Sequence, residues 1–152
     1  MSEALKIAII GDYNFTFNAH HATNLSLDHS SEFLEVELNY YWIKISEALK
    51  HKEGYFNQYD GIWIAPGPIE NPFYLNGIFK KISNKNIPVL ITGEGFKIFL
   101  EHLITQNQLL SQQEKLISEN LISGSSFERI TIEPRSKTFH QLYENFNNVE
   151  LS

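Results

Sequence analysis

Cysteine is absent from this sequence of 152 residues. Its absence excludes disulfide bonds, thiolate metal sites and every catalytic mechanism with a cysteine nucleophile. Basic residues are scarce as well, since twelve lysines and arginines stand against eighteen aspartates and glutamates and leave a formal net charge of −6. Nucleic acids and anionic membrane surfaces bind through basic patches, so this charge balance argues against both as the main partner.

Long hydrophobic runs are also missing. No stretch approaches the roughly 18 consecutive apolar residues of a membrane-spanning helix. The opening residues MSEALK lack the basic flank and the apolar run of a signal peptide, and we therefore expect a cytoplasmic protein. Apolar residues make up 42% of the chain and charged residues 20%, as in ordinary globular proteins. With no linker or repeat in sight, we expect a single domain over residues 1–152.

Short apolar runs alternate with helical patterns along the chain. The expected strands are residues 5–10, 34–43, 62–65, 88–91 and 127–133, and the expected helices are residues 19–30, 75–82, 96–104 and 138–146. Strands and helices that alternate at this spacing are typical of a parallel sheet. We therefore predict a three-layer α/β fold, with a mostly parallel sheet and helices on both of its faces.

Three short loops follow expected strands: GDYN at 11–14, PGP at 66–68 and TGEG at 92–95. In parallel sheets, ligands bind beyond the carboxyl ends of the strands. We therefore expect these loops to converge on one edge of the sheet and to form its ligand site. The candidate ligand-binding residues there are Asp12, His20, His21, Gly67, Gly93, Glu94, Gly95 and Lys97.

His20 and His21 stand at the start of the first expected helix. Two roles remain open for them, contact with an anion or another ligand and helix capping with packing. A metal centre would need a third ligand, and only Asp12 or Glu94 offers one, so we expect no metal. We also expect no cofactor, because IIGDYNF lacks the G-x-G-x-x-G of dinucleotide sites and is a poor phosphate loop for a flavin. A phosphoacceptor site like that of receiver domains is excluded by Ala65, which ends the third strand.

The segment PVLITGEGF at residues 88–96 has the outline of a nucleophile elbow: a strand, a sharp glycine-flanked turn and then a helix. Such a turn carries a cysteine or a serine at its apex, and this chain offers only Gly93 and Glu94 there. A carboxylate at a helix N-terminus is stabilised by the helix dipole, which weakens it as a base. We therefore favour Glu94 as an anionic cap over Glu94 as a catalytic group, with ligand contact as a third role.

Five segments, in this order along the chain, carry a family resemblance: KIAIIGDY at 6–13, AHHA at 19–22, YDGIWIAPG at 59–67, IPVLITGEGF at 87–96 and EPRSKTFHQLYE at 133–144. Together they resemble the class I glutamine amidotransferase domain of CTP synthase, and more closely the stand-alone CTP synthase-like proteins. The resemblance covers nearly the whole chain and implies a shortened form of the amidotransferase fold, which is flavodoxin-like.

The resemblance also shows which catalytic groups are missing. The family's turn reads Gly-Thr-Cys-Gly-Gly-Phe; this chain matches it at Thr92, Gly95 and Phe96. The nucleophile falls on Gly93, the glycine after it on Glu94, and the usual glutamine on Lys97. Glycine offers no atom that could form the glutamyl thioester, and loss of a triad nucleophile typically lowers the rate by about 10⁴ to 10⁶.

Two further departures point the same way. The family's activating histidine and glutamate lie near its C-terminus, and this sequence ends at Ser152, where the family is expected to continue. If Pro68 occupies the position of an oxyanion donor, it has no N–H to give. The resemblance therefore implies a relative that does not hydrolyse glutamine. We expect Glu94 to have a structural role there or to act as an anion that takes the place of the oxyanion.

These observations leave three hypotheses for the function. In the first, a non-catalytic relative binds a small molecule or a protein partner, such as a synthase chain, through the retained loop edge. In the second, an active amide hydrolase or amidotransferase uses Glu94 with His20 or His21. In the third, the chain is a structural subunit whose uncovered apolar surface is buried in a homodimer.

Overall fold

The computed structural model describes residues 4–108, 128–130 and 149–151. Its backbone contacts divide the chain into two compact units, Met1–Ile117 and Ser118–Ser152, and the expectation of one domain stays a prediction. In the second unit, β5 (Glu128–Ile130) and β6 (Val149–Leu151) form an antiparallel pair. The other described elements and all the loops that follow the expected strands up to residue 95 belong to the first unit.

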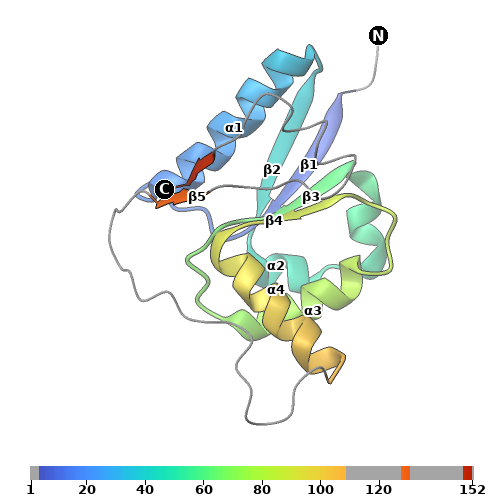
Figure 1. The fold of residues 1–152 in the computed structure, drawn as a ribbon. Coiled ribbons are helices and arrows are strands. Elements are labelled where there is room, and N and C mark those ends of the chain that lie inside the picture. The colour runs from blue at the N-terminus through green and yellow to red at the C-terminus, as the bar shows by residue number, and fades with distance from the viewer. Residues whose placement is uncertain (1–3, 109–127, 131–148, 152) are drawn as a thin grey trace, which may run out of the picture. The chain divides into compact units, whose positions relative to one another are not determined.

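The first unit is built on a parallel sheet with the strand order β2–β1–β3–β4 (Figure 1). Its strands are β1 (Leu5–Ile10), β2 (Leu38–Ile43), β3 (Gly61–Ile64) and β4 (Val89–Ile91). In the register, Ile9 of β1 pairs with Trp42 on one side and with Trp63 on the other. The chain therefore runs from β1 to β2 in one direction and resumes at β3 in the other, and ligands of such sheets bind where this order reverses.

Helices cover both faces of this sheet, as predicted. They are α1 (Asn18–Leu34), α2 (Ile45–Lys50), α3 (Pro72–Ile82), α4 (Gly93–Gln106) and a short 3₁₀ helix, η1 (Glu53–Gln58). Helix α1 lies on one face, and α2, α3 and α4 lie on the other (Figure 1). The three-layer α/β fold is thereby confirmed. None of the described helices has the length and apolar character that a bilayer crossing requires.

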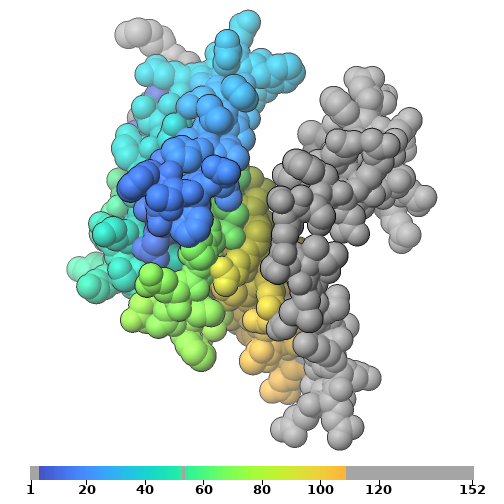
Figure 2. Space-filling view, turned by 90° about the vertical axis from the view of Figure 1, so that its left-hand side faces the viewer, coloured from blue at the N-terminus to red at the C-terminus, as the bar shows by residue number. Residues whose placement is uncertain are grey.

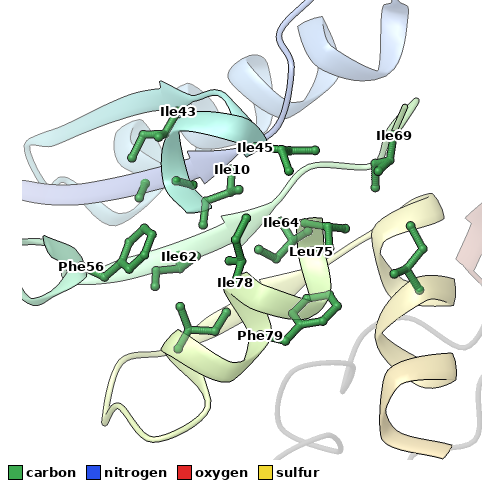
Figure 3. Packing of buried hydrophobic residues seen from close by; sticks show 14 residues of the cluster. Ile10, Ile43, Ile45, Phe56, Ile62, Ile64, Ile69, Leu75, Ile78 and Phe79 are labelled. Atoms are coloured by element: carbon green, nitrogen blue, oxygen red, sulfur yellow. The ribbon is translucent and has the colours of Figure 1, made fainter. Parts of the chain in front are cut away.

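The main core lies between the sheet and helices α2, α3 and α4 (Figure 3). On α3, apolar residues recur at intervals of three and four residues; Leu75, Ile78, Phe79 and Ile82 are all buried. They meet Ile10 and Ile64 from the sheet, which are also buried. Each such side chain contributes about 1.5–3 kcal/mol through the removal of apolar surface from water.

The layer formed by α1 is held differently, by polar contacts between the helix and strand β2. The indole N–H of Trp42 donates to Oδ1 of Asn24 at 2.8 Å, and the hydroxyl of Tyr40 donates to Oδ2 of Asp28 at 3.4 Å. Burial, followed by the hydrogen bond to Asp28, raises the pKa of Tyr40. No apolar side chain of α1 is buried, and its buried residues are His20 and Thr23, which explains why its sequence has a weak helical pattern.

The boundary between the first helix and the second strand was predicted wrongly. Helix α1 continues past residue 30 to Leu34, Glu35 ends it in the left-handed conformation with φ 53°, and β2 begins only at Leu38. The alternation of Leu34, Val36 and Leu38 suggested a longer strand. Inside the helix, however, the Ser30 hydroxyl donates to the carbonyl of Ser26 at 2.6 Å, so the serines that weakened the helical pattern are accommodated within the helix.

Other boundaries differ by smaller amounts. Helices α2 and η1 were not predicted, because each spans only six residues. Helix α3 begins at Pro72 because the Asn71 side chain accepts the N–H of Phe73 at 3.1 Å and proline suits the first helical position. Helix α4 already begins within the glycine turn, at Gly93. The predicted strand 127–133 is observed at residues 128–130 as β5, whereas residues 127 and 131–133 and the predicted helix 138–146 lie outside the described residues.

Candidate functional site

The loops that follow the parallel strands meet beyond the carboxyl end of the sheet, and hydrogen bonds join them. Figure 2 shows this face, with the segment that follows β1 in dark blue next to the segment that follows β3 in light green. The β1 loop is linked to the β3 loop through His20, and the β3 loop is linked to the start of α4 through Glu94. Two neighbouring sites lie along this edge: the elbow between β4 and α4, and a cleft beyond the ends of β1, β2 and β3.

The elbow has the predicted strand–turn–helix outline, but its apex has no room for a side chain. Gly93 adopts a left-handed conformation with φ 56°. A Cβ atom on Gly93 would lie 2.5 Å from the carbonyl oxygen of Pro66 and 2.8 Å from its Cα. The same Pro66 carbonyl accepts the N–H of Glu94 at 2.7 Å, which holds the two loops together. A cysteine at position 93 therefore does not fit this backbone.

The carboxylate of Glu94 is engaged by the loop after β3. Its Oε2 accepts the backbone N–H of Ile69 at 2.9 Å, and a Cβ on Gly67 would come within 2.7 Å of the same oxygen. Pro68, joined to Gly67 by a cis peptide bond, has no N–H, so Ile69 supplies the next donor. A hydrogen bond from an amide to a carboxylate is roughly twice as strong as a neutral one. Glu94 thus occupies a backbone donor of the loop after β3.

His20 joins the first loop to the third and is almost completely buried, with 1% of its surface exposed. Its Nδ1 accepts the backbone N–H of Asn14 at 2.9 Å, and its Nε2 lies 2.8 Å from the carbonyl oxygen of Gly67. Because an amide N–H only donates and a carbonyl only accepts, Nδ1 must carry the lone pair and Nε2 the proton. Both ring nitrogens are therefore used in holding the loops, and the ring also contacts Tyr13 and Phe17 at centroid distances of 5.8 and 5.7 Å.

The remaining sequence candidates are spread around this edge. His21 is exposed, and its Nε2 donates to the carbonyl of Phe15 at 2.6 Å. Gly95 is buried where α4 packs against β3, since a Cβ there would lie 2.9 Å from Cγ2 of Ile64. Lys97 is partly buried in the first turns of α4, and Asp12 lies in the cleft described next.

A cleft of about 600 Å³ opens beyond β1, β2 and β3. Its walls come from the loop after β1, the start of α2 and the loop that leads into α3. The lining residues are Asp12, Tyr13, Asn14, Phe15, Phe17, Lys44, Ile45, Ser46, Pro68, Glu70, Asn71 and Tyr74. The cleft therefore combines aromatic rings with two carboxylates and one ammonium group, at the point where the strand order reverses.

Sequence reasoning found one charged group of this cleft, Asp12, and missed Lys44 and Glu70. Both could have been found, because each comes within six residues after the end of a strand, Lys44 after β2 and Glu70 after β3. The loop after the second strand was left out of the predicted site, and the third loop was followed only as far as Pro68. The structure places Glu94 and Gly93 at the elbow, separate from the residues that line the cleft.

No metal centre is apparent in the part of the chain that the structure describes, where no three histidine, aspartate or glutamate side chains are close enough to share an ion. Within the same part, no hydrogen bond or ion pair uses the side chain of Asp12, Lys44 or Glu70. These three charged groups are therefore available to a ligand.

Comparison with known proteins finds a solved structure with a similar fold. No family model matches the sequence, and no curated protein matches it either. Among solved structures, the chain is similar to the glutaminase domain of CTPS from Trypanosoma brucei with bound acivicin, at a TM-score of 0.55 and 19% identity over 66% of this chain. The chain has a glutaminase-domain fold. It spans about 40% of the length of that structure, and at this identity the likeness concerns the fold alone.

Proposed function

We propose that this protein is a non-hydrolysing relative of the glutaminase fold that binds a small molecule in the cleft beyond β1, β2 and β3. The observation that carries the proposal is the closed elbow. The position of the nucleophile is Gly93, and Pro66 fills the space that any side chain there would need. A covalent glutaminase mechanism requires a nucleophilic atom at that apex.

The state of the neighbouring groups supports the same conclusion. The Glu94 carboxylate holds the Ile69 N–H, so a donor that could stabilise an oxyanion is already occupied. His20 uses both of its ring nitrogens in hydrogen bonds to the backbone, and a general base needs a free lone pair directed at the reacting proton. His21 points its Nε2 at the Phe15 carbonyl.

Binding is supported by the cleft itself. Ligand sites are concave, mostly apolar and equipped with a few polar groups, and in sheets of this kind they lie where the strand order reverses. The cleft is concave and lies at that point, and it combines aromatic and other apolar side chains with an equal number of polar ones; its volume of about 600 Å³ suits a small organic molecule. The alternative function, an active amide hydrolase that uses Glu94 with His20 or His21, predicts instead that the elbow binds glutamine.

Ammonia release separates the two functions. The pure full-length chain is incubated with L-glutamine beside the variants Glu94→Ala and Gly93→Cys, with a known glutaminase as the positive control. We expect no release above background from any of the three proteins. The wild type and Glu94→Ala have no nucleophilic atom at position 93, and Gly93→Cys forces its Cβ against the Pro66 backbone. Release by the wild type that disappears in Glu94→Ala would overturn the proposal.

The binding half of the proposal needs its own readout. Amide NMR spectra of the ¹⁵N-labelled chain are recorded with a mixture of amino acids, quaternary amines, carboxylic acids and nucleosides. Binding in the cleft shifts the amide signals of Asp12, Lys44 and Glu70 and leaves the signal of Glu101, on the far part of α4, unchanged. If no compound class shifts the three cleft signals, the cleft is not a ligand site for any of these classes and the proposed function is wrong.

A further inference from the structure

The charged groups of the cleft follow the strand order of the sheet. Lys44 follows β2, Asp12 follows β1 and Glu70 follows β3, and these strands are neighbours in the order β2–β1–β3. Adjacent strands lie about 4.8 Å apart, so the ends of β2 and β3 are separated by on the order of 10 Å of sheet edge. The cleft therefore holds one positive group, directly after β2, and two negative groups, one just after β1 and one in the loop between β3 and α3.

Aromatic rings surround these charges. Tyr13 and Phe15 are 42% and 75% exposed, and Phe17 and Tyr74 also line the cleft with much of their surface in solvent. Tyr13 and Phe17 contact the buried ring of His20. The N–H of Asn14, which lies between them in the sequence, donates to Nδ1 of the same ring and so holds their backbone segment. The faces of aromatic rings attract cations, and quaternary ammonium ligands are bound by such groups of rings.

This combination narrows the class of ligand. A phosphate ester would place its charge among two carboxylates with one lysine to offset them, and like charges at close range repel. A wholly apolar ligand would bury the charged groups without partners, which is costly. A zwitterion offers a partner to both kinds of charge in the cleft. Its cation can lie against the aromatic rings and the carboxylates of Asp12 and Glu70, while its own carboxylate faces the ammonium group of Lys44.

We propose that the cleft binds a small zwitterion that carries an alkylated ammonium group and a carboxylate. The inference rests on the proposed function, since it names the ligand class of the same cleft. Asp12 and Glu70 would attract the ammonium group, the aromatic rings would contact its alkyl groups, and Lys44 would pair with the carboxylate. No bond is made or broken in this event.

Three compounds of nearly equal shape test each charge. Glycine betaine has both charges, choline has the trimethylammonium group without the carboxylate, and tert-butylacetate has the carboxylate with carbon in place of the charged nitrogen. Amide NMR titrations at low salt give a dissociation constant for each compound. We expect betaine to bind most tightly, choline several-fold more weakly, and tert-butylacetate at least about 10-fold more weakly than betaine, since tert-butylacetate lacks the positive charge that the aromatic rings and carboxylates attract.

Matched variants assign the charges to residues. Lys44→Gln is expected to weaken betaine binding about 10-fold and to leave choline binding unchanged or slightly stronger. Asp12→Asn and Glu70→Gln are expected to weaken both compounds; Glu70 is exposed, so its variant folds even if Asp12→Asn does not. Glu101→Gln, on the exposed surface of α4, removes the same charge far from the cleft and should change neither constant.

The outcomes also separate this inference from the proposed function. Equal affinity for betaine and tert-butylacetate, or no shift at the cleft signals with any of the three compounds, overturns the zwitterion inference. If another compound class shifts those signals, the cleft remains a ligand site and only the ligand class was wrong. Ammonia release that depends on Glu94 would overturn the non-hydrolysing function and leave the betaine titration unaffected.

Discussion

The buried histidine provides the strongest test of how the site is held together. In His20→Ala, the N–H of Asn14 and the carbonyl of Gly67 both lose their partner, and the rings of Tyr13 and Phe17 lose their support. Each hydrogen bond contributes about 0.5–1.5 kcal/mol net, and truncation of a buried ring adds the cost of a cavity. We expect the free energy of unfolding to fall by about 2–4 kcal/mol in all.

Urea denaturation followed by tryptophan fluorescence measures this loss, because the ring centroids of Trp42 and His20 lie 5.0 Å apart. The matched control is His21→Ala. That exposed neighbour makes one hydrogen bond, to Phe15, so its loss should cost no more than about 1 kcal/mol. His20→Gln places an amide N–H₂ near the position of Nε2 and should regain part of the loss. If His20→Ala and His21→Ala destabilise the fold equally, the assignment of His20 as the link between the loops is refuted.

Three further changes test other parts of the structure. Gly93→Ala should cost at least about 2 kcal/mol in chemical denaturation, from left-handed strain and overpacking, whereas Gly54→Ala, where a Cβ meets nothing within 4 Å, should leave stability unchanged or raise it by up to about 1 kcal/mol. Ile78→Ala, in the fully buried core, should cost about 2–5 kcal/mol in the same assay. Burial, reinforced by Lys80, lowers the pKa of His102 from 6.5, so the unfolded chain binds the proton more readily and stability should fall as the pH drops below about 6.5. His102→Phe should flatten that part of the stability profile.

Each of these three has an outcome that contradicts it. Equal losses in Gly93→Ala and Gly54→Ala would mean that the elbow backbone gives way to a side chain. A loss below 1 kcal/mol in Ile78→Ala would place the core elsewhere. A stability profile that is the same for the wild type and His102→Phe between pH 7 and pH 5 would show that this histidine is not the titrating group.

The fold class was predictable because it depends on patterns that neighbouring residues carry. Continuous apolar runs such as residues 7–10 indicate buried parallel strands, and the spacing of Ile78, Phe79 and Ile82 indicates one face of a helix. The strand–turn–helix outline around Gly93 was visible for the same reason. That Gly93 offers no nucleophilic atom followed from the identity of that residue alone. The boundary near Leu34 was not predictable, because helical and alternating patterns overlap there and tertiary packing decides between them.

What only the tertiary structure decided is which of these residues share a site. The sequence by itself established that there is no cysteine, that the charge is negative and that the sheet is parallel. It also predicted that Asp12 lies at the carboxyl edge of the sheet. It left open whether His20 caps, packs or binds, since its two partners are separated from it along the chain by six and 47 residues. Lys44 and Glu70 join Asp12 only through the strand order β2–β1–β3, because that order depends on long-range pairing, which local sequence patterns do not encode.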